Sequence, residues 1–163
     1  MSENGDQKQS LQERFAPKNR CFGCGPANEK GLRIRSFALD SEADSEVVSQ
    51  WTPAPQHEAF ENILNGGIIG TLLDCHSNWT AVWHLVCRDG LTTAPAMVTA
   101  DFHIELRRPT PTDRPLGLSA RAVASDGPKV TVEAELAVDD QVTATCVGHF
   151  VAVKPGHPAY HRW

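Results

Sequence analysis

The segment Asn65-Gly-Gly-Ile-Ile-Gly-Thr-Leu-Leu-Asp74 determines the architecture of this chain, because two adjacent glycines there open a long apolar run. Apolar residues continue at helical spacing and Asp89-Gly90 provides a stop signal, which predicts one long helix from Gly66 to about Val86. A helix start without side chains presents bare N–H groups and a partial positive charge, and both attract an oxyanion. Asp74 follows about two turns later. We therefore expect a chemical site along this helix, with Asp74 as its base or nucleophile.

Strand-like segments precede and follow this helix. Residues 31–37 and 45–51 alternate apolar and polar side chains, which predicts a hairpin, and residues 53–64 are expected to form a loop. The order of two strands, one helix and four strands indicates an α+β domain in which an antiparallel sheet of about six strands wraps around one long central helix. The four later strands are expected at Met97–Leu106, Leu116–Ala124, Val130–Val138 and Val142–Val153.

Length and charge restrict the class of protein. The 163 residues suffice for one domain, and 15 Lys and Arg against 20 Asp and Glu give a formal net charge of −5, which argues against a nucleic-acid surface.

Polar residues interrupt every apolar run, so no membrane span is expected. The first residues are polar and resemble no secretory signal, and the five cysteines are an odd number. We therefore expect reduced thiols and a cytoplasmic location.

The folded domain is expected over residues 21–155. Residues 1–20 are interpreted as a flexible N-terminal tail with one short helix at Leu11–Phe15, and residues 156–163 as a C-terminal tail. A single curved sheet leaves its edges and the helix ends in need of a partner, so a homodimer or a dimer of dimers is expected.

Several motifs coincide with those of a known family. Gly66-Gly67 is followed by six residues and then by Asp74, and the chain also contains Cys21-Phe-Gly-Cys-Gly-Pro26, Glu105-Leu-Arg-Arg-Pro109 and Gly148-His-Phe150. From residue 21 to residue 153 this pattern resembles the hotdog-fold acyl-CoA thioesterases, specifically their PaaI-like, phenylacetate-degradation branch. The resemblance implies a hotdog fold, hydrolysis of an acyl-CoA thioester, and no cofactor besides the coenzyme A of the substrate.

The resemblance also implies roles along the helix. The thioester carbonyl would lie at the helix start of one protomer, polarised by the Gly67 N–H and the Asn65 amide, and Asp74 of the other protomer would act on it. The family has His before Gly-Gly, whereas Asn65 donates an N–H and caps a helix but carries no proton. Ser77, one turn after Asp74, is expected to orient the carboxylate or an attacking water.

Further residues are candidates for binding the substrate. Gly66 and Asn78 belong to the helix start and to a small, polar row of the helix, and the alternative for this row is an ordinary solvent-facing side. His57, in the loop before Gly-Gly, is expected to line the pocket. The acyl chain is expected to run beside the helix against three bulky residues: Ile68, Trp79 and Trp83.

Three cations at strand ends are expected to contact the phosphates of coenzyme A. Arg107 and Arg108 precede Pro109, and Lys129 follows the turn at residues 125–128. Guanidinium groups pair well with phosphate oxygens, and the alternative is that all three are solvated charges.

Cys21 and Cys24 invite a zinc or redox interpretation. Structural zinc takes four ligands, usually from two such pairs, and no second pair exists, so Cys75-His76 would complete a site only by coincidence of folding. A redox pair would open a helix after a strand, but a Gly-Pro turn follows here. The sequence therefore favours a packed turn, with no metal.

Two other functions fit the same fold. Asn65 in place of the family's His leaves open a non-catalytic module that binds acyl-CoA or an acyl carrier. A hotdog hydratase is the weaker alternative, because the loop before the helix offers His57 with Glu58 and Glu61 but no Asp.

Overall fold

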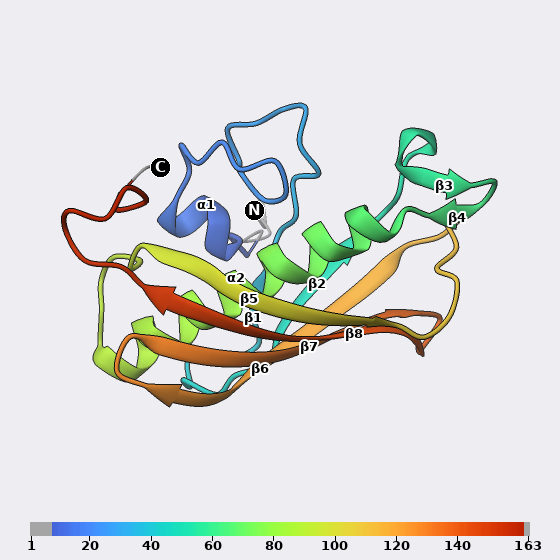
Figure 1. Ribbon diagram of the computed structural model, residues 1–163. Coiled ribbons are helices and arrows are strands. Elements are labelled where there is room, and N and C mark those ends of the chain that lie inside the picture. Colours follow the sequence, from blue (N-terminus) through green and yellow to red (C-terminus); the bar gives the residue numbers. More distant parts are fainter. Residues whose placement is uncertain (1–7, 162–163) are drawn as a thin grey trace, which may run out of the picture.

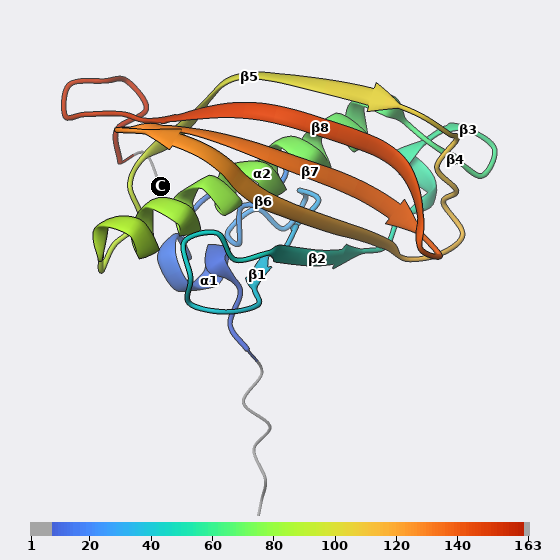
Figure 2. The same cartoon turned by 90° about the horizontal axis from the view of Figure 1, so that it is seen from below.

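The computed structural model describes residues 8–161. Six strands form one antiparallel sheet in the order β1-β2-β6-β7-β8-β5, and helix α2 (Gly66–Asp89) lies along its concave face (Figures 1 and 2). This confirms the expected α+β architecture. The strands are β1 (Phe37–Ala38), β2 (Val47–Trp51), β5 (Met97–Leu106), β6 (Leu116–Asp126), β7 (Lys129–Val138) and β8 (Gln141–Ala152).

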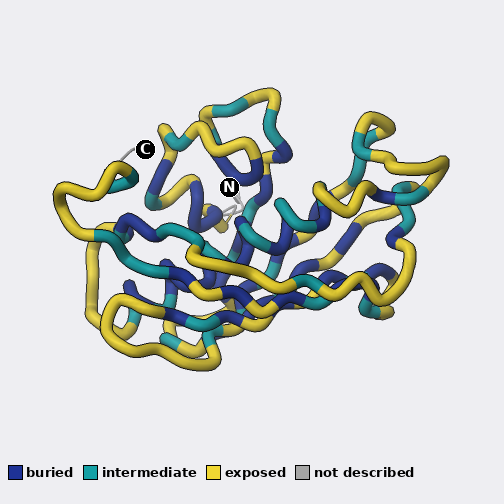
Figure 3. The backbone as a smooth tube through the Cα atoms, in the orientation of Figure 1, coloured by how far each residue is buried: buried dark blue, intermediate teal, exposed yellow. Residues whose placement is uncertain are grey.

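Helix α2 begins and ends at the predicted signals. Asn65 caps its first turn through its side chain, and Gly90 ends it in the left-handed conformation, with φ 63°. The helix runs to Asp89, about one turn beyond the predicted end. Its buried side is bulky and packs on β5, β6, β7 and β8. Figure 3 shows the burial of each residue along the chain.

The sheet is covered on one face. Along β7, buried and more exposed residues alternate, with Val130, Val132, Ala134, Leu136 and Val138 turned to the helix side. By contrast β5, an edge strand, is mostly exposed beyond its first residue, Met97. The core therefore lies between α2 and the middle of the sheet, and the β5 edge borders it.

The strand expected over residues 31–37 is mostly absent from the structure. Only Phe37–Ala38 pairs with β2, because Arg33 has φ 58°, a conformation incompatible with a strand. The N–H groups of Leu32 and Ile34 donate instead to the carbonyls of Phe22 and Gly23. The alternating burial that suggested a strand is present, but it packs this segment against the loop at residues 21–24.

The loop expected over residues 53–64 contains structure of its own. A 3₁₀ turn (Pro55–His57) leads into a short hairpin of β3 (Glu58–Phe60) and β4 (Ile63–Leu64), directly before α2. The hairpin is bound to the chain after β5, because Leu64 N–H donates to the carbonyl of Thr110.

The predicted helix near the N-terminus is present as α1 (Leu11–Phe15), capped by Ser10 and Glu13. Ser10, Leu11, Gln12 and Ala16 are buried, so this short helix packs on the domain. Residues 1–7 and 162–163 of the expected tails lie outside the described part of the chain.

Buried polar groups join α1 to α2. Gln12 exchanges two hydrogen bonds with Ser36, and the Ser36 hydroxyl lies 2.9 Å from Nδ1 of His76. Nε2 of His76 donates to the carbonyl of Val47 at 2.9 Å, so Nδ1 of a neutral ring accepts from Ser36. Complete burial lowers the pKa of His76 to about 4, which keeps the ring neutral at neutral pH.

In the part of the chain that the structure describes, no helix has both the length and the apolar character required to cross a membrane.

Candidate active site

A groove of about 500 Å³ runs between the first turns of α2 and the edge strand β5. Its floor is formed by the glycines of α2, opposite side chains of β5: a Cβ on Gly70 would lie 3.6 Å from Ile104 Cδ1, an ordinary contact distance. Twelve residues line it: Cys21, Phe22, Gly23, Gly66, Gly67, Gly70, Thr71, Asp74, Cys75, Phe102, Ile104 and Leu106.

Asp74 is the carboxylate of this groove. Its side chain is half-buried, and one carboxylate oxygen accepts a hydrogen bond of 2.7 Å from the Thr99 hydroxyl. Burial raises the pKa of Asp74, and the Thr99 hydrogen bond offsets part of this rise. A carboxylate of raised pKa, held by one hydrogen bond and open on its other oxygen to a pocket, is equipped to take a proton or to attack a carbonyl.

Thr99 is a site residue that the sequence did not reveal. The pairing of β5 with β8 shifts between Thr99 and Asp101, a bulge that changes the phase of the strand. As a result Thr99 faces the helix, and so do Phe102 and Ile104 further along. A bulge leaves no clear sign in the sequence, so strict alternation would have placed Thr99 and Phe102 on opposite faces.

The start of α2 differs from the expected oxyanion site. The Asn65 side-chain oxygen accepts hydrogen bonds from the N–H of Gly67 at 2.8 Å and of Ile68 at 3.2 Å. The Gly67 N–H is therefore occupied by the cap rather than free. Among the described residues no acceptor engages the N–H of Gly66 or the side-chain NH₂ of Asn65, and these two groups remain available to a ligand.

The other candidates on the helix and in the loop before it, Asn78, Ser77 and His57, lie in different surroundings. Asn78 borders a smaller hollow of about 180 Å³ that it shares with Asp74. Ser77 is fully buried on the core side, near Cys146 of β8, and lines neither hollow. The His57 ring accepts from the N–H of Ala54 and stacks near Trp51, so it does not line the groove.

The three candidate cations are dispersed. Arg107 and Arg108 follow Leu106, which places them beside the groove mouth at the helix start. The Arg107 side chain turns to the outer face of the sheet, where it pairs with Glu105 at 3.2 Å. Lys129 pairs with Val151 in the sheet, at the opposite end of β8 from Leu106. The structure thus brings the backbone of the two arginines near the groove, with the Arg107 side chain on the outer face of the sheet, and places Lys129 away from the groove.

The residues expected to form the apolar wall of the groove also differ from those that the structure shows. Trp79 and Trp83 are buried in the core, Ile68 packs against it, and none of them lines the groove, although Trp79 borders the smaller hollow that Asp74 and Asn78 share. The wall is formed instead by four side chains: Phe22, Phe102, Ile104 and Leu106. They come from the cysteine loop and from β5, and Phe22, Phe102 and Leu106 are among the most exposed large apolar residues of the described chain.

The cysteine pair has a third neighbour. Folding brings Cys75 of α2 beside Cys21 and Cys24, so the coincidence that a shared cysteine site required does occur. Hydrogen bonds from Cys24 and Cys75, with those of two backbone N–H groups, lower the pKa of Cys21 far below its ordinary value.

Solved structures share this architecture. A crystal structure of a thioesterase superfamily protein matches with a TM-score of 0.66 and 24% identity, covering 81% of this chain and 60% of that chain. The fold is that of the hotdog thioesterases. A thioesterase superfamily protein from Shewanella loihica PV-4 matches with a TM-score of 0.60 and 24% identity over 79% of this chain and 98% of its own.

The hotdog fold is also shared with the E. coli PaaI protein of the phenylacetic acid degradation operon, with a TM-score of 0.64 and 19% identity over 78% of this chain and 85% of that chain. The present chain spans 60% of the length of the thioesterase superfamily structure reported first above. No family model and no curated protein matches the sequence. The shared feature is thus the fold, and the chemistry has to be argued from the groove.

Proposed function

We propose that this protein hydrolyses an acyl-CoA thioester to a free acid and coenzyme A. The observation that carries the proposal is Asp74, a half-buried carboxylate of raised pKa inside a groove with a glycine floor and an apolar wall. The carboxylate would activate a water for attack on the thioester carbonyl, and the thiolate of coenzyme A would leave. Alternatively it would attack the carbonyl directly, expelling the thiolate to form a mixed anhydride, which water would then hydrolyse to the free acid and the restored Asp74 carboxylate. Thr99 would hold Asp74 in place for either step.

The wall supports an acyl group of mainly apolar character. Phe102 and Ile104 face the glycines of α2 across the groove, which leaves room for a flat or narrow acyl group along the helix. At the helix start, the free N–H of Gly66 and the NH₂ of Asn65 would polarise the thioester oxygen, in place of the expected Gly67 N–H. Arg107 and Arg108, beside the mouth, remain the candidates for the phosphates of coenzyme A.

The working form is proposed to be a homodimer or a dimer of dimers. Within residues 8–161 no strand pairs with the outer side of β5, and Phe102, Leu106 and Phe22 are exposed around the groove. A second copy would cover this apolar edge and would close the groove from the open side. In such a dimer Asp74 of one protomer would act at the helix start of its partner.

The decisive experiment is a thiol-release assay with short, long and aromatic acyl-CoA substrates, comparing wild type with Asp74→Asn. We expect a loss of about a hundredfold or more in kcat, because a positioned base or nucleophile contributes on that scale. Thermal unfolding should be unchanged, since the Asn amide fills the same space. Asp89→Asn is the matched control, because Asp89 lies on the same helix but is exposed at its end. Wild-type turnover by Asp74→Asn would contradict the mechanism.

One observation favours a second candidate, a module that binds acyl-CoA without hydrolysing it. The cap of Asn65 on the Gly67 N–H removes one donor that an oxyanion would use. In that case wild type would bind acyl-CoA and release no thiol above the Asp74→Asn background. The hydratase has no comparable support, because His57, Glu58 and Glu61 do not line the groove.

A further inference from the structure

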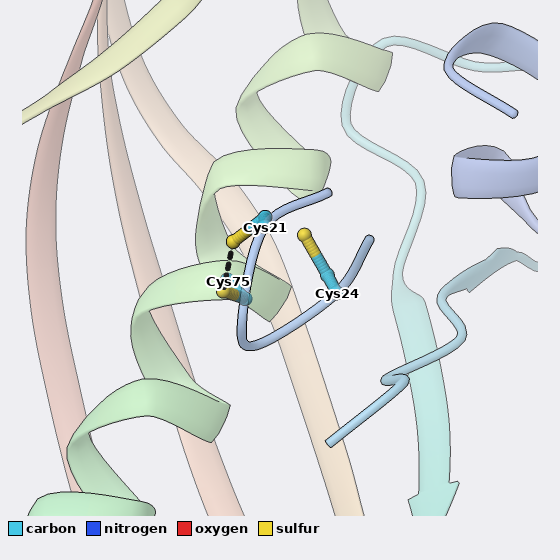
Figure 4. Close-up of side chains that lie close together, drawn as sticks. All are labelled: Cys21, Cys24 and Cys75. Atoms are coloured by element: carbon cyan, nitrogen blue, oxygen red, sulfur yellow. Dashed lines mark hydrogen bonds between the residues drawn. The ribbon is translucent and has the colours of Figure 1, made fainter. Parts of the chain in front are cut away.

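Three cysteines meet beside the groove, and the proposed hydrolysis uses none of them. Cys21 and Cys24 lie on the loop before β1, and Cys75 lies on α2 (Figure 4). All three sulfurs lie within 4.8 Å of one another, and those of Cys21 and Cys75 are 3.8 Å apart. Cys24 and Cys75 are buried, whereas Cys21 is exposed. A disulfide would engage two of these thiols, so the convergence of three calls for another explanation.

The loop is shaped to bring the sulfurs together. A Cβ on Gly23 would lie 2.3 Å from the Cys75 sulfur, so only glycine lets the loop approach the helix at this point. A Cβ on Gly25 would similarly meet the backbone oxygen of Asn19 at 2.5 Å. The two glycines between and after the loop cysteines therefore make the three-sulfur arrangement possible.

The Cys24 sulfur also receives a hydrogen bond of the kind that stabilises a thiolate. The Trp79 indole N–H donates to the Cys24 sulfur at 3.3 Å. Such outer partners orient metal-binding side chains and offset their negative charge.

We propose that Cys21, Cys24 and Cys75 bind a Zn²⁺ ion. With Zn–S bonds of about 2.3 Å, tetrahedral geometry separates neighbouring sulfurs by about 3.8 Å. The Cys21–Cys75 distance of 3.8 Å equals this spacing, and a separation of at most 4.8 Å closes to it with a shift of about 1 Å. Three thiolates select a soft or borderline ion such as Zn²⁺ over Mg²⁺ or Ca²⁺. Each thiol gives its proton to the solvent on binding.

The fourth coordination position of the proposed Zn²⁺ would be filled by a water molecule. In residues 8–161 no other His, Cys, Asp or Glu atom joins the group of three sulfurs. The cluster borders the hollow of about 180 Å³, which Asn19 and Asn78 also line and which offers polar partners to a bound water. The ion would fasten the loop that carries Phe22, one side of the groove wall, to the helix that carries Asp74. This site stands independently of the proposed hydrolysis.

The test is metal binding by the full chain. Protein freed of metal under reducing conditions should take up one Zn²⁺ per chain, measured by elemental analysis after desalting. Co²⁺ in its place should give a sulfur-to-metal charge-transfer band and the visible bands of a tetrahedral thiolate site. Binding of Zn²⁺ should also raise the melting temperature, since the ion links two elements of the folded state only. A chain that takes up no Zn²⁺, or that shows a Cys21–Cys75 disulfide by mass spectrometry in its place, would overturn the proposal.

Variants locate the site. Cys21→Ser is chosen first, because Cys21 is exposed and its loss leaves the core intact. We expect its Zn²⁺ affinity to fall by about a hundredfold or more, since even outer-shell substitutions cost 10–100-fold. Cys75→Ser should fall equally and should lose the Co²⁺ charge-transfer band. Cys87→Ser is the matched control on the same helix, outside the cluster. Equal loss in Cys87→Ser, or none in Cys21→Ser, would refute the assignment.

Discussion

At the start of α2, the Asn65 side chain has two possible roles, as a helix cap and as an oxyanion donor. Its oxygen caps the N–H groups of Gly67 and Ile68, while its NH₂ has no partner among the described residues. The cap contributes to stability, whereas the NH₂ would contribute only in the transition state. Substitutions that keep one function and remove the other separate the two.

Asn65→Ser keeps a capping oxygen and removes the NH₂, and Asn65→Ala removes both. If the NH₂ is an oxyanion donor, both variants should raise the barrier to thioester hydrolysis by about 2–4 kcal/mol. Only Asn65→Ala should also lower the free energy of unfolding, by about 1 kcal/mol. Turnover and urea unfolding, measured on the same preparations, distinguish these outcomes. Full activity in Asn65→Ser would reduce the residue to a cap and leave the Gly66 N–H as donor.

At the scale of elements, the glycine in the second turn of α2 lowers the stability of the helix and forms part of the groove floor. Gly70 lies in the second turn of the helix, where glycine is less stable than alanine by about 1 kcal/mol. A Cβ there would meet Ile104 and Phe102 only at 3.6 Å and 4.0 Å, which are ordinary contacts. Nothing in the packing therefore requires glycine, so its value lies in the space that it leaves open.

Gly70→Leu should make the protein more stable by roughly 0.5–1 kcal/mol and should abolish acyl binding, because the side chain fills the groove. Gly70→Ala should gain similar stability and lose much less activity, as the smaller control. Melting temperature and KM for each acyl-CoA measure the two effects. A Gly70→Leu variant with unchanged KM would show that the acyl group does not lie in this groove.

The polar link between α1 and α2 gives a pH dependence to stability. An unfolded His takes up a proton near pH 6.5, whereas burial holds the pKa of His76 at about 4 in the folded chain. Between these values the unfolded state binds more protons, so the free energy of unfolding should fall as the pH is lowered from 6.5 toward 4, by about 3 kcal/mol in all. His76→Gln keeps a donor and an acceptor but does not titrate. Urea unfolding across this range should show a weaker slope in His76→Gln, and equal slopes would contradict the assignment.

For the whole molecule, the open edge is the prominent feature. Among the strands that the structure describes, β5 pairs with β8 alone, and the exposed Phe102 and Leu106 lie on it. Unpaired edges with apolar side chains associate readily unless they are covered.

We therefore predict that the protein sediments as a dimer or a larger even assembly at micromolar concentration. A charge on the apolar edge, Leu106→Asp, should weaken this association, because it places a carboxylate in the apolar surface that the second copy would cover. The exposed but separate Leu39→Asp is the control. A stable monomer with full activity would contradict both the dimer and the shared site.

The sequence alone determined the local structure and the position of the carboxylate. Helical spacing, the Asn65 cap and the Gly90 stop specify α2, and period-two runs with turn residues specify β5 to β8, because these signals act between residues close in the chain. Asp74 and the glycines were visible for the same reason. The resemblance to hotdog thioesterases added the fold, which the structure confirms.

Only the tertiary structure decided what surrounds that carboxylate. Thr99 reaches Asp74 through a bulge, Phe22 and Phe102 replace the expected tryptophans, and Cys75 joins two cysteines some fifty residues earlier in the chain. Each of these contacts joins segments far apart in sequence, and its formation depends on strand register and on how closely glycine lets two backbones approach. Strand register and the distance between two backbones are set only when the whole molecule packs, because no local pattern of residues encodes them.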